Sequence, residues 1–176
     1  HKVSTMIRAE GEIKSFQEYF VKERGEPRID KIIYEGSEWA EPVEKILDSL
    51  RDPELSGVII CPSNPFLSID PILSLEALKS ALLSVDVPII AVSPIIGGKA
   101  VKGPTDKIMR ELGFKQSALG IAEYYNQLIS HFVLDNEDAY LCPEIESLGL
   151  EVLVCNTLMK TLDEKTELAD NVIKFI

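Results

Sequence analysis

The sequence predicts an α/β fold of three layers, in which a mostly parallel sheet has helices on both faces. Two observations support this prediction. From about residue 41 onward, short and uniformly apolar strands alternate with helical patterns, as expected for βαβ units whose strands are buried on both sides. The composition of the 176 residues, 45% hydrophobic and 27% charged, is ordinary for one globular domain.

The N-terminal residues have a different pattern and predict a small α+β extension over residues 1–36, before the larger α/β part over residues 37–176. We expect a hairpin, a short helix and a strand, in that order, over residues 3–13, 16–24 and 29–34. Gly11 can supply the positive φ of the hairpin turn, and Ser15 can cap the helix.

The larger part is predicted from its periodicity. Apolar residues at helical spacing predict helices near residues 43–50, 72–82, 108–112, 118–129 and 169–176. Apolar runs predict strands over residues 57–61, 87–92, 132–134 and 150–155. The chain begins on a strand-like run without an initiator Met, and we expect it to be the C-terminal part of a longer protein.

Charge and cysteine content exclude several classes of function. The net charge of −11 disfavours a nucleic-acid partner, because an acidic surface repels phosphate backbones. No apolar run is long enough to span a membrane. The three cysteines form no CxxC motif, so we expect reduced thiols in a cytoplasmic protein, with Cys61 and Cys155 in the core.

Two loops are the candidate functional segments, because ligands of open α/β sheets bind beyond the carboxyl ends of the strands. Residues 61–71 follow one predicted strand and residues 93–104 follow the next. If these strands are parallel neighbours, both loops face a shared crevice. Pro104 is expected at the first position of the following helix, whose N-terminus would suit an anionic ligand such as a phosphate.

The residue types in these loops favour ligand binding. Prolines on either side of Ser63 and Asn64 stiffen the backbone, and a Gly-Gly pair lets a ligand approach the main chain. The candidate binding residues are Ser63, Asn64, Pro65, Ser68, Ser93, Pro94, Gly97, Gly98 and Lys99. A simple rigid turn and solvated lysines, Lys102 included, remain the alternative interpretation.

Four other positions are weaker candidates. Asp135 and Asp138 follow a strand and could bind a metal, but helix capping is the favoured role. Tyr124 could line a pocket, and Thr157 could reach the same crevice from the last strand. His131 has no identifiable partner and is expected to be structural.

Several motifs resemble the 2-phospho-L-lactate transferase family, and together they run through nearly the whole chain. The first is Pro62-Ser63-Asn64-Pro65 with Ser68-Ile69 and Pro71-Ile72-Leu73, and the second runs from Ala91 to Ala100 and continues in Lys102-Gly103-Pro104. A third is Glu10-Gly11 followed by Phe16-Gln17-Glu18-Tyr19. Asp70 departs from the family, which usually has Gly at this position.

The resemblance implies a Rossmann-like fold and a specific reaction. Such enzymes transfer a 2-phospholactyl group, or in some relatives a phosphoenolpyruvyl group, from a GDP-activated donor to a hydroxyl of a deazaflavin precursor. GMP is released, Mg²⁺ assists, and the product leads to coenzyme F-420. The resemblance also implies a homodimer, metal ligands outside this chain, and an isolated chain that is inactive. The alternative is a non-catalytic regulator of the same fold that binds a nucleotide sugar.

Overall fold

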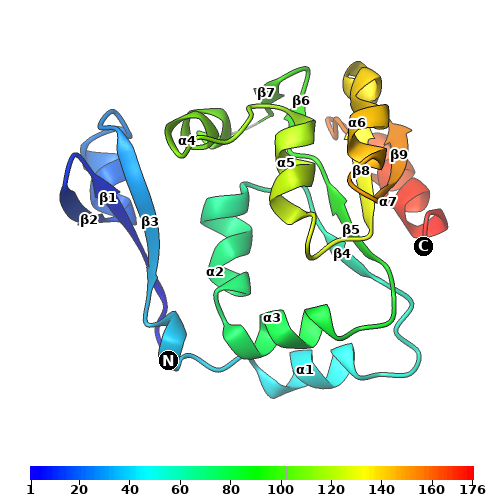
Figure 1. Ribbon diagram of the computed structural model, residues 1–176, viewed down its shortest axis with the longest axis horizontal. Coiled ribbons are helices and arrows are strands. Elements are labelled where there is room, and N and C mark those ends of the chain that lie inside the picture. The colour runs from blue at the N-terminus through cyan, green and yellow to red at the C-terminus, as the bar shows by residue number, and fades with distance from the viewer. Residues whose placement is uncertain (102) are drawn as a thin grey trace. The chain divides into compact units, whose positions relative to one another are not determined.

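A computed structural model describes residues 1–101 and 103–176 of the chain (Figure 1). Contacts within the chain divide it into two compact units. Unit 1 contains residues 1–52, 64–85 and 107–114, and unit 2 contains residues 53–63, 86–106 and 115–176. The boundary expected after residue 36 stays a prediction.

Unit 1 begins with a three-stranded antiparallel sheet. Its strands, in the spatial order β2-β1-β3, are β1 (Ser4–Ala9), β2 (Glu12–Ser15) and β3 (Ile29–Glu35). The predicted hairpin is confirmed: Glu10 and Gly11 form a two-residue turn with φ values of 51° and 83°. This left-handed conformation matches the twist of the two strands, and Gly adopts it without strain.

The predicted helix after β2 is shorter than expected. It is a π-helix, η1 (Glu18–Lys22), and the hydroxyl of Ser15 accepts a hydrogen bond of 3.2 Å from the backbone N–H of Glu18. Tyr19 is fully buried, whereas Phe16 is 38% exposed. The aromatic face is therefore only partly covered.

The remaining helices of unit 1 correct two expectations. They are η2 (Ser37–Trp39), α1 (Glu44–Leu50), η3 (Pro65–Ile69), α2 (Asp70–Leu73), α3 (Glu76–Leu83) and most of α4 (Thr105–Glu111). The prediction of a single helix near residues 72–82 is wrong, because the chain breaks between α2 and α3. Leu75 has an extended backbone there, and the hydroxyl of Ser74 donates to the carbonyl of Pro71 at 2.9 Å. Residues 65–71 are helical rather than a loop, and α4 begins one residue after Pro104.

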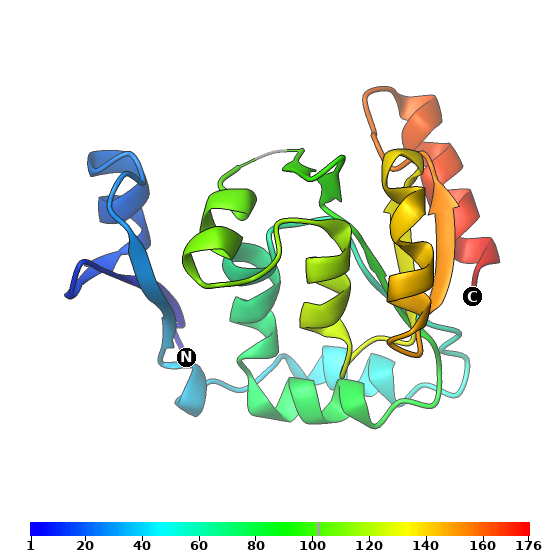
Figure 2. The same ribbon diagram turned by 45° about the horizontal axis from the view of Figure 1, so that its top comes forward.

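Unit 2 contains the predicted parallel sheet. Its strands, in the spatial order β4-β5-β8-β9, are β4 (Val58–Ile60), β5 (Ile89–Val92), β8 (His131–Asp135) and β9 (Glu151–Cys155). Helix α7 (Leu162–Lys174) covers one face, and α5 (Ala118–Tyr125) and α6 (Cys142–Glu146) lie on the other (Figures 1 and 2). The three-layer α/β fold is confirmed.

The core of unit 2 explains this arrangement. Ile90, Val92 and Val133 on one sheet face contact Leu168 and Val172 of α7, and all five side chains are buried. Apolar residues at positions i and i+4 put one face of α7 on the sheet, and burying it supplies the main driving force for this packing.

Two short elements of unit 2 were not predicted. Strands β6 (Ile95–Ile96) and β7 (Lys99–Ala100) form a small antiparallel hairpin, and η4 (Asn136–Leu141) follows β8 directly. All three cysteines are free, but Cys61 is exposed at the end of β4, so its expected place in the core is wrong. No helix of the described residues is long and apolar enough to cross a membrane.

Candidate functional site

The carboxyl edge of the sheet in unit 2 gathers the polar residues that follow its strands. β4 and β5 are parallel neighbours, as predicted, so the chain leaves both strands at the same edge. Ser63 follows β4, Ser93 follows β5, and Asp135 ends β8. Parallel sheets of this kind bind ligands beyond this edge.

The segment after β5 is rigid at Ser93. This residue is only 2% exposed, and its hydroxyl accepts from the N–H of Ile95 at 3.1 Å and donates to the carbonyl of Ile95 at 2.9 Å. Its own N–H donates to the carbonyl of Val133 at 2.8 Å. The Ser93 side chain thus stabilises the backbone turn around Pro94, and the β6–β7 hairpin begins directly after this turn.

Gly97 and Gly98 form the turn of the β6–β7 hairpin. Their φ values are 56° and 73°, a conformation that side-chain-bearing residues rarely adopt. A Cβ atom on Gly97 would also lie 2.6 Å from Oε2 of Glu137. The group that approaches this main chain closely in the structure is therefore Glu137, and the approach of a ligand stays a prediction. Lys99 is exposed, and Lys102 lies outside the described residues.

Two buried carboxylates connect the loops at this edge. Oδ2 of Asp138 accepts the N–H of Gly97 at 2.9 Å. Oδ1 of Asp135 accepts the N–H of Glu137 at 3.1 Å, which confirms the expected helix cap. Oδ2 of Asp135 accepts both the N–H and the hydroxyl of Thr157, at 2.8 and 3.1 Å.

Asp138 is the more unusual carboxylate. It is fully buried, and its Oδ1 has no hydrogen-bond partner among the described residues. Burial raises the pKa of Asp138 above its ordinary value, and the charges of Asp135 and Glu137 add to this effect, against the hydrogen bond from Gly97. The sequence alone gave Asp138 no such role, because its contact with Gly97 joins residues 41 positions apart.

The other predicted site residues lie in unit 1. Asn64 caps η3: its Oδ1 accepts the N–H of Leu67 at 3.0 Å. Pro65 is buried at the first position of that helix, and Ser68 is exposed within it. Because Ser63 belongs to unit 2, the shared crevice stays a prediction.

Asp70, the departure from the family pattern, takes part in a defined contact of unit 1. The hydroxyl of Tyr34 lies 2.7 Å from the carbonyl oxygen of Phe66 and 3.0 Å from Oδ2 of Asp70, and its single proton is shared between them. The side chain of Asp70 therefore helps to attach η3 and α2 to strand β3.

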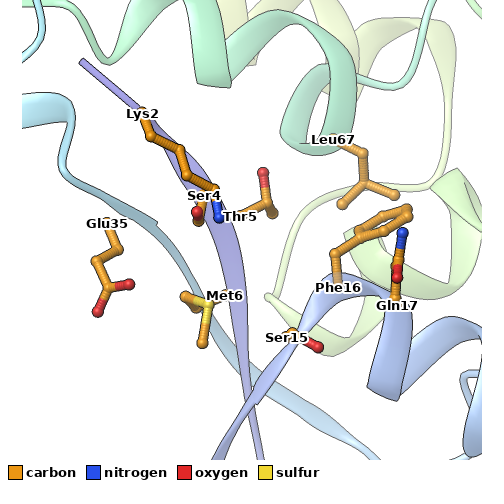
Figure 3. A pocket seen from close by; sticks show the side chains of 9 residues that line it. All are labelled: Lys2, Ser4, Thr5, Met6, Ser15, Phe16, Gln17, Glu35 and Leu67. Carbon is orange, nitrogen blue, oxygen red and sulfur yellow. The ribbon is translucent and has the colours of Figure 1, made fainter.

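Unit 1 also contains a groove of about 620 Å³ beside strand β1 (Figure 3). The β1–β2 ladder ends at the pair Met6–Ser15, so Thr5 has a strand neighbour only on the β3 side. Figure 3 shows Leu67 and Phe16 close together in this groove, with Thr5 pointing towards them. None of the nine predicted site residues lines it.

The structure assigns no ligands to the magnesium ion that the resemblance implies, and this ion stays a prediction. Within residues 1–101 and 103–176, no three His, Cys, Asp or Glu side chains are grouped so that they could hold a metal ion. Both oxygens of Asp135 and Oδ2 of Asp138 accept hydrogen bonds from within the chain.

Comparison with known proteins identifies the family. Residues 1–162 match the family described as 2-phospho-L-lactate transferase CofD. The 2-phospho-L-lactate transferase of Methanocaldococcus jannaschii is 40% identical over 174 residues, which are 99% of this chain and 54% of that protein. The enzyme of the same name from Methanosarcina barkeri is 37% identical over 171 residues, which are 97% of this chain and 54% of that protein. The chain thus spans about half the length of these relatives.

Solved structures agree on the fold. A structure of a Bacillus halodurans protein has a TM-score of 0.63 at 11% identity and covers 98% of this chain and 59% of that one. A second structure from this organism, titled as a member of the UPF0052 family, has a TM-score of 0.58 at 12% identity and covers 96% of this chain and 58% of that one. Such low identity supports the fold alone, whereas the match over residues 1–162 shows that the chain belongs to the 2-phospho-L-lactate transferase CofD family.

Proposed function

We propose that the complete protein moves a 2-phospholactyl group from a GDP-activated donor to the hydroxyl of 7,8-didemethyl-8-hydroxy-5-deazariboflavin and releases GMP. A phosphoenolpyruvyl donor is the variant of the same reaction. The observation that carries the proposal is the family match over residues 1–162, with relatives named 2-phospho-L-lactate transferase at 37–40% identity. The chain is about half as long as those relatives, so the activity is proposed for the complete protein.

The proposed reaction is a phosphoryl-type transfer. The acceptor oxygen forms a bond to the phosphorus that carries the lactyl group, while the bond from this phosphorus to the GMP oxygen breaks. The acceptor proton passes to solvent, and GMP leaves with the electron pair of the broken bond. Positioning and stabilisation of negative charge dominate such reactions, so preformed backbone donors are the relevant groups.

The geometry of unit 2 supports this chemistry. Ser63, Ser93, Pro94, Gly97, Gly98 and Lys99 follow neighbouring strands, and in our proposal they bind the nucleotide part of the donor. Hydrogen bonds of Ser93 and Gly97 fix the backbone before a ligand arrives. Asn64, Pro65 and Ser68 belong to unit 1 and are proposed to contact substrate through the loop and helix after β4.

The remaining partners are also proposals. We expect a cytoplasmic homodimer that binds neither nucleic acid nor membrane. Mg²⁺ is proposed from the family resemblance, but the described residues supply no site for it, so none of them is assigned to the ion.

The test is a fluorescence titration of the deazaflavin precursor with the complete protein, with and without GDP and Mg²⁺. We expect saturable binding that GDP enhances. Incubation with the activated donor should then give a product heavier by the phospholactyl group, together with one equivalent of GMP, and EDTA should stop the reaction.

Two results would reject the proposal. One is the absence of deazaflavin binding by the complete, folded protein. The other is a tight response to a UDP-sugar with none to GDP, which would point to the non-catalytic regulator instead.

A further inference from the structure

We propose that Asp138 and Asp135 are positioning residues that hold two segments at the carboxyl edge of the unit 2 sheet in their binding conformation. Asp138 holds the β6–β7 hairpin after β5, and Asp135 holds residues 156–159 after β9. The inference rests on the proposed function, because it assigns these carboxylates a purpose in that transfer.

The hairpin needs an external support. It consists of only two residue pairs, Ile95–Ala100 and Ile96–Lys99, and an isolated hairpin of this size is not stable in water. The buried side chain of Ile95 supports one strand of the hairpin, and Asp138 supports the turn itself through its 2.9 Å hydrogen bond to the N–H of Gly97. Asp138 lies inside η4 and is therefore not explained as a helix cap.

Asp135 has a second role beyond capping. Its Oδ1 caps η4, but its Oδ2 bonds both the N–H and the hydroxyl of Thr157, a residue that is only 4% exposed. A carboxylate that accepts three hydrogen bonds has one well-defined orientation. The backbone after β9 is thereby fixed relative to the end of β8.

The acidic cluster has no compensating charge among the described residues. No Lys, Arg or His of residues 1–101 and 103–176 forms an ion pair with Asp135, Glu137 or Asp138. Buried carboxylates without a cation usually cost stability, and Asp138 also leaves one oxygen unpartnered. An arrangement that costs stability while fixing loops at a binding edge is typical of a functional site.

The proposal predicts a loss of transfer without a loss of fold. In the complete protein, Asp138→Ala should lower kcat/KM by roughly tenfold or more, because small misplacements of binding groups slow such reactions strongly. The melting temperature should change little, because the lost hydrogen bond to Gly97 is offset by the removal of a buried carboxylate that has no cation partner among the described residues. Asp138→Asn keeps an oxygen for Gly97 and should restore most of the activity.

Hydrogen exchange separates the two supports. In Asp138→Ala, amides of residues 95–100 should exchange faster while those of residues 155–159 remain protected. Asp135→Ala should speed exchange mainly in residues 155–159 and, because it also removes the cap of the helix that carries Asp138, to a smaller extent in residues 95–100. Glu144→Ala, which removes an equally negative but exposed side chain from α6, is the matched control and should change neither segment.

The outcomes distinguish this inference from the proposed function. If the unmodified complete protein transfers no group, the proposed function fails, and the exchange data alone decide whether the carboxylates hold the loops. If the protein is active and Asp138→Ala has the kinetics and exchange of Glu144→Ala, the positioning role is rejected. An equal loss of activity and melting temperature in both Asp138 variants would show a purely structural role and would also reject it.

Discussion

Asn64 shows how one side chain can have a structural and a binding role that must be separated. Its Oδ1 caps η3 by accepting the N–H of Leu67, and its amide group is a proposed ligand contact. Asn64→Asp keeps an oxygen for the cap but replaces the amide NH₂. If the amide binds substrate, Asn64→Asp should reduce kcat/KM of the complete protein about as strongly as Asn64→Ala.

The melting temperature provides the control for Asn64. Loss of an N-cap costs about 1 kcal/mol, so Asn64→Ala should unfold at a lower temperature than Asn64→Asp. Near-normal kinetics of Asn64→Asp would mean that Asn64 is only a helix cap and does not belong to the site.

Asp138 also makes a prediction about pH. Burial raises the pKa of Asp138 above 3.8, so the carboxyl group of Asp138 binds its proton more tightly in the folded protein than in the unfolded chain. Stability from this group is therefore fully present below pH 3.8 and is lost as the pH rises through the folded pKa. Asp138→Asn does not titrate, so denaturant unfolding from pH 3.5 upward should show the unmodified protein losing stability relative to this variant. A difference that stays constant with pH would contradict the assigned ionisation.

The residues of the site could be predicted from sequence only where local chemistry marks them. Pro94 and the Gly97-Gly98 pair predicted a loop with an unusual backbone. In the structure, Pro94 precedes the β6–β7 hairpin and the two glycines form its turn. The sequence could not identify Asp138 as a loop support, because an acidic residue shortly after a strand has the pattern of a helix cap. Its role comes from a contact with Gly97, which no local pattern contains.

At the scale of elements, helix α4 is attached to the N-terminal sheet of unit 1 by the half-buried Lys107. Nζ of Lys107 donates to the hydroxyl of Tyr19 at 2.8 Å, to the carbonyl of Pro27 at 3.1 Å and to Oε2 of Glu111 at 2.7 Å. Glu111 in turn accepts the N–H of Ile29 at 3.0 Å. Three acceptors thus satisfy all three protons of one ammonium group.

Lys107→Met should lower the free energy of unfolding by about 2 kcal/mol, because it leaves three partly buried acceptors without a charged donor. Burial alone would lower the pKa of Lys107, but hydrogen bonds to Glu111 and Tyr19 raise it above 10.5. The stabilisation is therefore complete at neutral pH and is lost only in strong alkali, as the pH rises through the folded pKa. Lys79→Met, on the exposed side of α3, is the control, and equal denaturation midpoints for the two variants would contradict the prediction.

Elements with a long apolar period were predictable, and short or polar ones were not. The four parallel strands carry clear apolar runs, although only β5 and β8 are mostly buried and Ile59 of β4 is exposed. Helix α7 was predicted only over residues 169–176 and begins earlier, at Leu162. Strands β6 and β7 have two residues each, which is too short for any periodicity. η4 contains Asn136, Glu137 and Asp138 in succession, and its helical conformation depends on the cap from Asp135.

At the scale of the whole molecule, strand β4 leaves an apolar edge in unit 2. In the described residues it pairs only with β5, and Ile59 at its centre is 40% exposed. An unpaired apolar edge strand is a template for association between chains. The net charge of −11 opposes such association, and salt screens this repulsion.

We therefore expect the 176-residue chain to associate as salt is raised, with an apparent mass in light scattering that increases with protein concentration. Ile59→Lys places a charge on the edge and should keep the chain at the mass of one copy under the same conditions. Ile173→Lys makes the same substitution at an exposed position of helix α7 rather than in strand β4, and should associate like the unmodified chain. If both variants behave alike, apolar surface in general drives the association, and the edge of β4 has no special part in it.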